Sequence, residues 1–222
     1  MLDFDGTILD TEHSNYLAWA EMWHDHGYTL DLAEWQRHIG AVEAFDPEVE
    51  LEARLGRPIE AHHHERRRRR RDAIHAELGP RPGVLGWLAE AEDRGVPVGI
   101  ASSSPAGWVE GHLDQLGLRR YFAVLVTRDD DVPVKPAPDP YLLACTRLGG
   151  DPRSSVAVED SPHGVASAAA AGLFTVAVPH GLTDQLDLSA ADVVVPALGD
   201  LSLAAAIGQA AIRPRGDRAQ SL

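Results

Sequence analysis

The sequence contains one cysteine, one lysine and no long hydrophobic run, and each scarcity narrows what the protein can be. Cys145 has no partner for a disulfide within the chain, which favours a reducing compartment, and we expect it to be a small buried hydrophobic side chain. No segment approaches the roughly 18 consecutive apolar residues of a membrane span, and no signal peptide opens the chain. The composition therefore predicts a cytoplasmic protein without a membrane segment.

Positive charge is also scarce. The 20 basic residues face 34 acidic ones, which leaves a formal net charge of −14. Such a field opposes binding to nucleic acid and to anionic membranes, so we expect neither as a partner. An anionic substrate would need a metal ion or a local cation at its site. All basic residues but one are arginine, which makes Lys135 the exception.

Short apolar runs alternate with helical patterns through most of the chain, and this alternation predicts parallel strands joined by crossover helices. The expected strands are 96–101, 123–127, 156–158, 174–178 and 192–195. The expected helices are 84–94, 106–116, 140–148, 164–171 and 201–211. We therefore predict an α/β fold with a Rossmann-like parallel sheet and helices on both faces.

Residues 11–79 differ from this pattern, because their apolar residues have helical spacing and no strand is evident. We predict that they form a small all-helical cap inserted after the first strand. The α/β catalytic core would then comprise residues 1–10 and 80–212, followed by a flexible tail at 213–222. Only Met1 and Leu2 precede Asp3, so the first strand either is short or begins upstream of Met1.

The segment Asp3-Phe4-Asp5-Gly6-Thr7 places two carboxylates at positions i and i+2, which share one face of an extended strand. One carboxylate can attack a substrate while the other protonates the leaving oxygen. The structural alternative is an ordinary Asp-Gly turn.

Two further segments offer groups that bind phosphate. Ser102 and Ser103 follow a predicted strand and precede a helix opened by Pro105, so a hydroxyl and backbone N–H groups could hold phosphate oxygens there. A simple serine cap of the helix is the alternative. Lys135 lies between prolines that restrict the backbone around a single cation. The alternative is an ordinary lysine in a surface loop.

The last segment is Glu159-Asp160-Ser161, which follows the predicted strand 156–158. Adjacent carboxylates there suit a hard cation such as Mg²⁺, and the alternative is a solvated acidic turn that caps the next helix. All of these segments lie at carboxyl ends of predicted strands, where open α/β sheets bind their ligands.

The ordered set Asp-x-Asp-Gly-Thr, Ala-Ser, Lys-Pro-Ala-Pro-Asp and Glu-Asp-Ser resembles the four motifs of the haloacid dehalogenase superfamily. It is most similar to the branch that contains β-phosphoglucomutase and small-metabolite phosphatases, which carries a helical cap after the first motif. The resemblance covers the chain from Asp3 to about Pro196.

The resemblance implies a role for each matching residue. Asp3 would form an aspartyl-phosphate, and Asp5 would act as general acid and then as general base. Ser102, Ser103 and Lys135 would bind the phosphoryl oxygens. The ligands of Mg²⁺ would be Asp3, the backbone carbonyl of Asp5, Glu159 and Asp160.

Two cap positions depart from the mutases of this branch. Asn15 stands where they carry a histidine, and Glu43 lies near the position of their phosphate-binding arginine. Both changes favour a hydrolase over a mutase. Since Lys135 is the only lysine, the cap lysine of phosphonate-cleaving relatives is missing, and Asp5 distinguishes the chain from the dehalogenases.

We therefore expect a monomeric Mg²⁺-dependent phosphohydrolase whose substrate is a small phosphorylated metabolite, such as a sugar phosphate. The alternatives are a β-phosphoglucomutase-type isomerase and a catalytically idle binding protein of the same fold.

Six consecutive arginines, Arg66–Arg71, stand in the predicted cap. On a helix they point in all directions, so some must face solvent. Three interpretations stay open at this point. In the first, the run forms a solvated helix whose arginine stems cover apolar neighbours. In the second, one or two of the arginines attract the phosphorylated substrate. In the third, the run contacts nucleic acid, which the net charge opposes.

Overall fold

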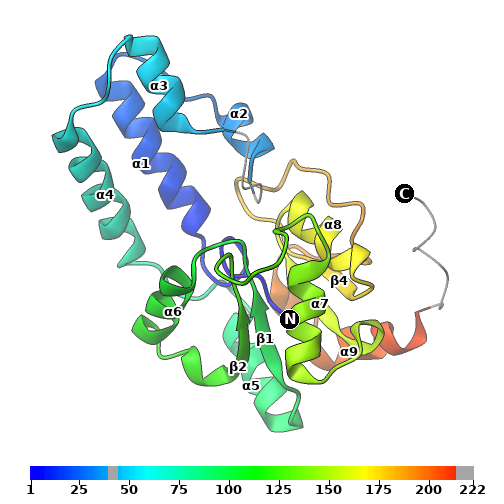
Figure 1. Cartoon of the computed structure of the whole chain (residues 1–222). Coiled ribbons are helices and arrows are strands. Elements are labelled where there is room, and N and C mark those ends of the chain that lie inside the picture. Colours follow the sequence, from blue (N-terminus) through cyan, green and yellow to red (C-terminus); the bar gives the residue numbers. More distant parts are fainter. Residues whose placement is uncertain (40–44, 214–222) are drawn as a thin grey trace.

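A computed structural model of the chain describes residues 1–39 and 45–213 (Figure 1). Glu43 and residues 214–222 of the predicted tail therefore lie outside the described residues. Within the described ranges, no helix combines the length and the apolarity that crossing a bilayer requires.

The described residues form five strands, which pair in parallel: β1 (Val98–Ala101) with β2 (Phe122–Val126), β3 (Val156–Glu159) with β4 (Phe174–Ala177), and β4 with β5 (Val193–Val194). The first residues of the chain join the two groups, because Leu2 bridges both Ile100 and Val158. The resulting order is β2, β1, residues 1–3, β3, β4, β5. The first strand is thus a single bridging residue in the middle of the sheet.

Main-chain hydrogen bonds hold this short central segment firmly. The Leu2 N–H donates to the Gly99 carbonyl at 2.9 Å, and the Asp3 N–H donates to the Val158 carbonyl at 3.0 Å. Asp3 is therefore fixed between β1 and β3, at the carboxyl edge of the sheet.

Helices cover both faces of the sheet, as predicted. One hydrophobic cluster joins the sheet to α5 (Val84–Arg94), α6 (Ala106–Gln115) and α9 (Leu203–Ile212). A second cluster, which includes the buried Cys145, joins the other face to α7 (Asp139–Leu148) and α8 (Pro162–Ala170). Successive residues of a strand pack in opposite clusters, because their side chains point to opposite faces of the sheet. Ile100 packs in the first cluster and Ala101 in the second. Short 3₁₀ turns lie at Arg119–Tyr121, Pro152–Ser154 and Leu198–Asp200.

The predicted helix at 164–171 begins two residues earlier in the structure, at Pro162. Ser161 caps it by accepting a hydrogen bond from the Gly164 N–H at 3.1 Å, and Pro162 tolerates the first helical position because no N–H is needed there. The predicted strand 192–195 is likewise shorter, since β5 is an edge strand of two residues.

Four helices follow the first residues: α1 (Thr11–Asp25), α2 (Leu32–Arg37), α3 (Pro47–Leu55) and α4 (Ala61–His75). They extend away from the sheet, with α1 and α4 side by side (Figure 1). No described residue between Thr11 and His75 belongs to a strand. Helices α1, α2 and α3 share a hydrophobic cluster of their own, built on Trp19, Trp23 and Leu51.

The arginine run lies on α4 and fastens it to α1. Arg66 and Arg70 each pair with Glu21 at 3.1 Å, and the guanidinium of Arg67 lies 4.1 Å from the ring centre of Trp19. Exposed ion pairs of this kind contribute only about 0–1 kcal/mol each. The contacts fit a solvated helix whose arginine stems cover apolar neighbours.

Candidate active site

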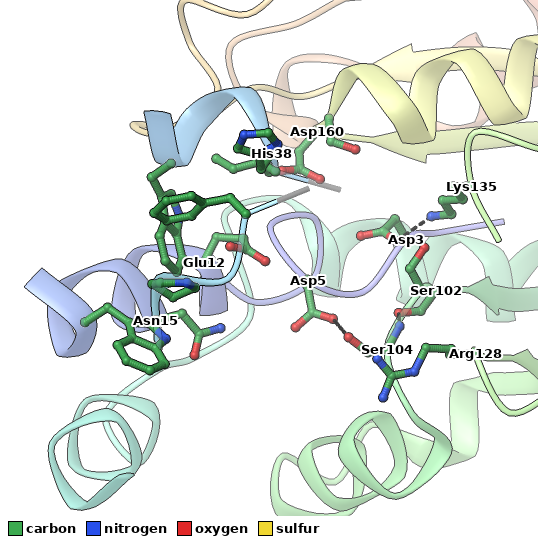
Figure 2. Close-up of a pocket in the computed structure, with 17 residues that line it drawn as sticks. Asp3, Asp5, Glu12, Asn15, His38, Ser102, Ser104, Arg128, Lys135 and Asp160 are labelled. Atoms are coloured by element: carbon green, nitrogen blue, oxygen red, sulfur yellow. Dashed lines mark hydrogen bonds and ion pairs between the residues drawn. The ribbon is translucent and has the colours of Figure 1, made fainter. Parts of the chain in front are cut away.

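A cavity of about 400 Å³ lies between the carboxyl edge of the sheet and the helices α1 and α2 (Figure 2). Its described lining divides into two walls. The core wall consists of Asp3, Asp5, Ser102, Ser103, Ser104, Arg128, Lys135, Asp160 and Ser161. The opposite wall consists of Glu12, Asn15, Trp19, Trp35, His38, Ile39, Phe45 and Pro47.

Lys135 lies at the centre of the core wall and is 4% exposed, so it is not a surface loop lysine. Its Nζ donates to Asp3 Oδ1 and to Glu159 Oε1, both at 2.5 Å. The Tyr141 hydroxyl also donates to Glu159 Oε1, at 2.6 Å. Burial opposes the charge of Lys135, but the two carboxylates outweigh it and raise the lysine pKa above its ordinary value. Lys135 is therefore a fixed cation beside Asp3.

Three buried carboxylates converge beside this lysine. Oxygen atoms of Asp3, Glu159 and Asp160 all lie within 4.8 Å of one another. Burial raises the pKa of Asp3 well above its ordinary value, and although Lys135 lowers it, the neighbouring carboxylates raise it further. Burial likewise raises the pKa of Glu159. One lysine leaves this group short of positive charge, and oxygen donors in this arrangement fit a hard divalent cation such as Mg²⁺.

Two glycines make room for these carboxylates. A Cβ atom at Gly164 would lie 2.0 Å from Glu159 Oε2, and one at Gly6 would lie 2.2 Å from Asp160 Oδ2. Gly6 also has a φ of 83°, which residues with a side chain rarely adopt. Glu159 and Asp160 are buried, so the solvated acidic turn is excluded as an account of this segment.

Asp5 is held by three side-chain donors. Its Oδ1 accepts from the Thr11 hydroxyl at 2.6 Å and from Trp108 Nε1 at 2.9 Å, and its Oδ2 accepts from the Ser104 hydroxyl at 2.6 Å. Thr11 begins α1, whereas Ser104 and Trp108 belong to the core. The Asp5 carboxylate is thus shared between the two walls of the cavity.

The loop after β1 contributes polar groups from consecutive serines. Ser102 is buried, and its hydroxyl oxygen accepts the Ser104 N–H at 3.1 Å. The Ser103 hydroxyl is buried and has no hydrogen-bond partner among the described residues. Arg128, which sequence analysis did not single out, lines the cavity beside this loop, and its backbone N–H donates to the Ser104 carbonyl at 3.0 Å. The loop and Arg128 together can receive an anion.

His180 is a second residue that sequence analysis missed. It is buried, its Nε2 lies 3.1 Å from Asp160 Oδ2, and its Nδ1 lies 3.4 Å from Asp10 Oδ1. The residue follows the carboxyl end of β4. Applying the rule of strand carboxyl ends to this strand would have identified it.

Arg81 connects two loops at the same edge of the sheet. Its guanidinium donates to the carbonyls of Gly6, Val178 and Pro179, and its backbone N–H donates to the Ile8 carbonyl at 2.8 Å. Arg81 therefore ties the loop that follows Asp5 to the loop that follows β4.

Glu12 and Asn15 come from the first turns of α1 and line the wall opposite the core. Burial raises the pKa of Glu12 to about 8, with further contributions from the carboxylates of Asp5, Asp160 and Asp10. Asn15, which the sequence resemblance aligns with the histidine of the mutases, also lines the cavity. Glu43, the other departure from the mutases, belongs to the undescribed residues.

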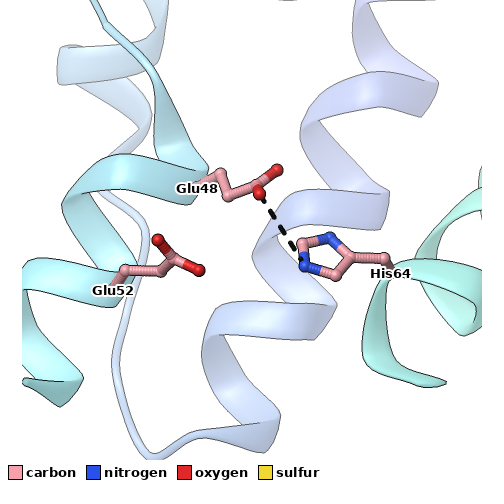
Figure 3. Close-up of side chains that lie close together, drawn as sticks. All are labelled: Glu48, Glu52 and His64. Atoms are coloured by element: carbon pink, nitrogen blue, oxygen red, sulfur yellow. Dashed lines mark ion pairs between the residues drawn. The ribbon is translucent and has the colours of Figure 1, made fainter. Parts of the chain in front are cut away.

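A separate cluster outside the cavity combines Glu48, Glu52 and His64 (Figure 3). His64 Nε2 lies 3.7 Å from Glu48 Oε1, and Glu52 Oε1 accepts the Ile59 N–H at 2.8 Å. These contacts join α3 to α4 and to the turn between them. The cluster is thus accounted for by the packing of these helices.

Comparison with known proteins gives consistent matches over most of the chain. The sequence profile of the haloacid dehalogenase-like hydrolases matches residues 1–172. The protein named "Putative phosphatase YhcW" of Bacillus subtilis (strain 168) is 40% identical over 92% of this chain and 93% of its own length. Validoxylamine A 7′-phosphate phosphatase of Streptomyces hygroscopicus subsp. limoneus is 32% identical over 90% of this chain and 94% of its own.

Solved structures agree with these sequences. The structure of CbbY from Rhodobacter sphaeroides in complex with phosphate superposes with a TM-score of 0.72 at 28% identity, over 92% of this chain and 96% of that one. The chain therefore belongs to the haloacid dehalogenase-like hydrolase family, as a phosphatase of that type.

Proposed function

We propose that this chain hydrolyses a small phosphorylated metabolite with the help of Mg²⁺, through a phosphoryl group carried transiently on Asp3. The observation that carries the proposal is the pairing of buried Asp3 with Lys135 at 2.5 Å, inside a cavity lined by further phosphate-binding and acidic groups. Phosphoryl transfer requires in-line positioning and compensation of charge on the equatorial oxygens, and these groups can supply both. The phosphate bound to CbbY supports the same ligand class.

Asp3 would attack phosphorus and release the alcohol part of the substrate. Lys135 orients the attacking carboxylate and binds a phosphoryl oxygen, while Ser102 and Ser103 bind the others through hydroxyl and backbone N–H groups. The unpartnered Ser103 hydroxyl supports this assignment, because a buried donor without a partner costs free energy that a ligand oxygen would recover.

Mg²⁺ would be held by Asp3, Glu159 and Asp160 together with the backbone carbonyl of Asp5. When bound, it neutralises phosphoryl charge and reduces the repulsion between Asp3 and an anionic substrate. His180 would orient Asp160 through the 3.1 Å contact to its carboxylate.

Asp5 would protonate the leaving alcohol and then accept a proton from the water that releases phosphate. In the present geometry both carboxylate oxygens of Asp5 accept hydrogen bonds from side chains. Acting as an acid requires Asp5 to take up a proton and to exchange at least one of these bonds. Because Thr11 is one of the donors, a movement of α1 would change the environment of Asp5 directly.

The four helices α1 to α4 would serve as a cap, within the predicted boundaries 11–79. Residues of α1 and α2, and the segment that leads into α3, form the wall of the cavity that faces Asp3, so movement of the cap would admit substrate and then exclude bulk water. The separate hydrophobic cluster of α1 to α3, together with the ion pairs of Arg66 and Arg70 with Glu21 that join α4 to α1, supports movement as a unit.

The test is release of inorganic phosphate from 4-nitrophenyl phosphate, measured with Mg²⁺ and after its removal by a chelator. We expect turnover only with the metal, and none from Asp3→Asn, whose amide is not a nucleophile. Acid-quenched enzyme should carry one added phosphoryl group on the peptide that contains Asp3. Turnover by Asp3→Asn, or a phosphoryl group on another peptide, would contradict the proposal.

A further inference from the structure

Trp108 differs in kind from the other side chains that donate to Asp5. Its Nε1 donates to Asp5 Oδ1 at 2.9 Å, whereas Thr11 and Ser104 donate through hydroxyl groups. A hydroxyl group rotates and can both donate and accept, but an indole Nε1–H only donates. The bond from Trp108 is therefore the one of the three that cannot reverse its direction.

The indole ring is held in place by its neighbours. Trp108 lies in the first turn of α6, where its backbone N–H donates to the Pro105 carbonyl at 3.1 Å. The His112 ring lies one turn further along α6, with its centre 4.3 Å from that of the indole. From α4, His75 packs edge-on at 5.1 Å between ring centres, and the guanidinium of Arg71 lies 5.5 Å from the centre of the indole. These contacts fix the direction in which the indole N–H points.

The hydrogen bonds are divided unequally between the two carboxylate oxygens of Asp5. Each carboxylate oxygen offers about two lone-pair positions. Oδ1 accepts from both Thr11 and Trp108, so its positions are filled. Within residues 1–39 and 45–213, Oδ2 accepts from Ser104 alone (Figure 2), so it keeps a position for a proton. The exchange of a bond that proton uptake requires then falls on Ser104, whose hydroxyl can turn from donor to acceptor.

From this arrangement we infer that Trp108 is a positioning residue for Asp5. Its N–H holds Oδ1 throughout the reaction and leaves Oδ2 as the oxygen that carries the proton. The inference rests on the proposed phosphohydrolase function and adds a residue to it.

The proton on Oδ2 accounts for both steps of the proposed reaction. In the first step, a carboxylate oxygen of Asp3 bonds to phosphorus, the bond from phosphorus to the alcohol oxygen breaks, and the proton on Oδ2 passes to that oxygen. In the second step, a water oxygen bonds to phosphorus, the bond to Asp3 breaks, and one proton of the water passes to Oδ2. Asp5 thus returns to its starting form, with Oδ1 bonded to Trp108 in both steps.

The experiment varies the leaving group in order to separate positioning of the acid from general damage. 4-Nitrophenolate leaves readily without a proton, whereas phenolate, which lacks only the nitro group, depends more on receiving one. The value of kcat/KM for 4-nitrophenyl phosphate and for phenyl phosphate, measured with Mg²⁺, reports the first step, in which Asp5 is the acid. Trp108→Phe removes the indole N–H and keeps an aromatic ring. We expect this variant to lose at least about tenfold more kcat/KM for phenyl phosphate than for 4-nitrophenyl phosphate, because a well-placed acid contributes about 10²–10⁴-fold.

Trp87→Phe is the matched control. It also removes a hydrogen-bonded indole N–H, which donates to the carbonyls of Leu198 and Leu201 at 3.1 and 2.6 Å, and Trp87 does not line the cavity. This control should lower the unfolding free energy and leave the ratio of the two kcat/KM values unchanged. A ratio that changes equally in both variants would show that it follows general damage, and would overturn the inference.

A second variant and a spectrum cover the case in which Trp108→Phe does not fold, which circular dichroism would reveal. Trp108→Met carries a flexible apolar side chain that adapts to the space, and the same change in ratio is expected of it. If neither variant folds, NMR of the five indole N–H groups decides, because Asp5→Ala should shift the resonance of Trp108. Five unchanged resonances would overturn the inference.

The outcomes distinguish this inference from the proposed function. An equal loss for both substrates in Trp108→Phe, or no loss for either, would overturn the positioning role and leave the phosphohydrolase function standing. No hydrolysis of either substrate by the unmodified protein with Mg²⁺ would overturn the proposed function and the inference together.

Discussion

Replacing Gly164 by alanine tests the packing around the proposed metal site. The added Cβ would lie 2.0 Å from the carboxylate of Glu159, far inside any normal contact. That carboxylate is buried and is held by Lys135 at 2.5 Å and Tyr141 at 2.6 Å, so it moves only by lengthening those bonds or by shifting α8. Overpacking of this kind costs about 1–3 kcal/mol of stability. A displacement of about 1 Å in a catalytic group can lower the rate about 100-fold.

The measurement has two parts. Chemical denaturation should show a lower unfolding free energy for Gly164→Ala, and a Mg²⁺ titration of phosphate release should show a higher half-saturating concentration. Gly111→Ala is the matched control, because Gly111 also lies inside a helix and no atom lies within 4 Å of its added Cβ. That control should be more stable by up to about 1 kcal/mol, since alanine favours a helix over glycine. The reasoning is wrong if both variants behave alike.

Three further outcomes are expected. Lys135→Met leaves the carboxylates of Asp3 and Glu159 without their cation, so it should cost about 3–5 kcal/mol of stability at pH 7. This loss should shrink at lower pH, because the two carboxylates have raised pKa values and take up protons there. Urea unfolding of the variant and the unmodified protein at several pH values measures the effect. His180→Ala should raise the Mg²⁺ concentration for half-maximal activity about 10–100-fold, with partial recovery in His180→Gln, whereas an unchanged titration would remove His180 from the metal site. β-Glucose 1-phosphate should release inorganic phosphate in coupled assays, and efficient formation of glucose 6-phosphate would instead establish a mutase.

The architecture of the α/β core was predictable because the apolar patterns along the sequence coincide with the strands and helices that the tertiary structure contains. Apolar runs identified all five strands, and the helix of Val84–Arg94 has the predicted ends. The groups gathered around Asp3 were predictable for a related reason: parallel strands bring their carboxyl ends to one edge, so Lys135 and Glu159 meet Asp3 although they are distant in sequence.

Other parts of the site depend on contacts that no local pattern encodes. From the sequence, Trp108 is an ordinary residue of a predicted helix, yet its Nε1 donates a hydrogen bond to Asp5, 103 positions away in the sequence. Glu12 reads as a favourable acidic residue in the first turn of a helix. Its approach to the cavity depends on the direction in which α1 leaves the sheet. Neither residue belongs to the four motifs, and both became visible only through tertiary geometry.

The bonds made by Arg81 bear on the mechanics of cap opening. The guanidinium of Arg81 donates hydrogen bonds to carbonyls of two loops, at Gly6 and at Val178 and Pro179, and its backbone N–H donates to the Ile8 carbonyl. These hydrogen bonds hold the two loops together at the edge of the sheet. If the four helices of the proposed cap rotate as one body without breaking these bonds, the two pivots would lie outside the bonded loops, in the peptides just before Thr11 and just after His75. The loop that follows Asp5 would then keep its place while the proposed cap moved.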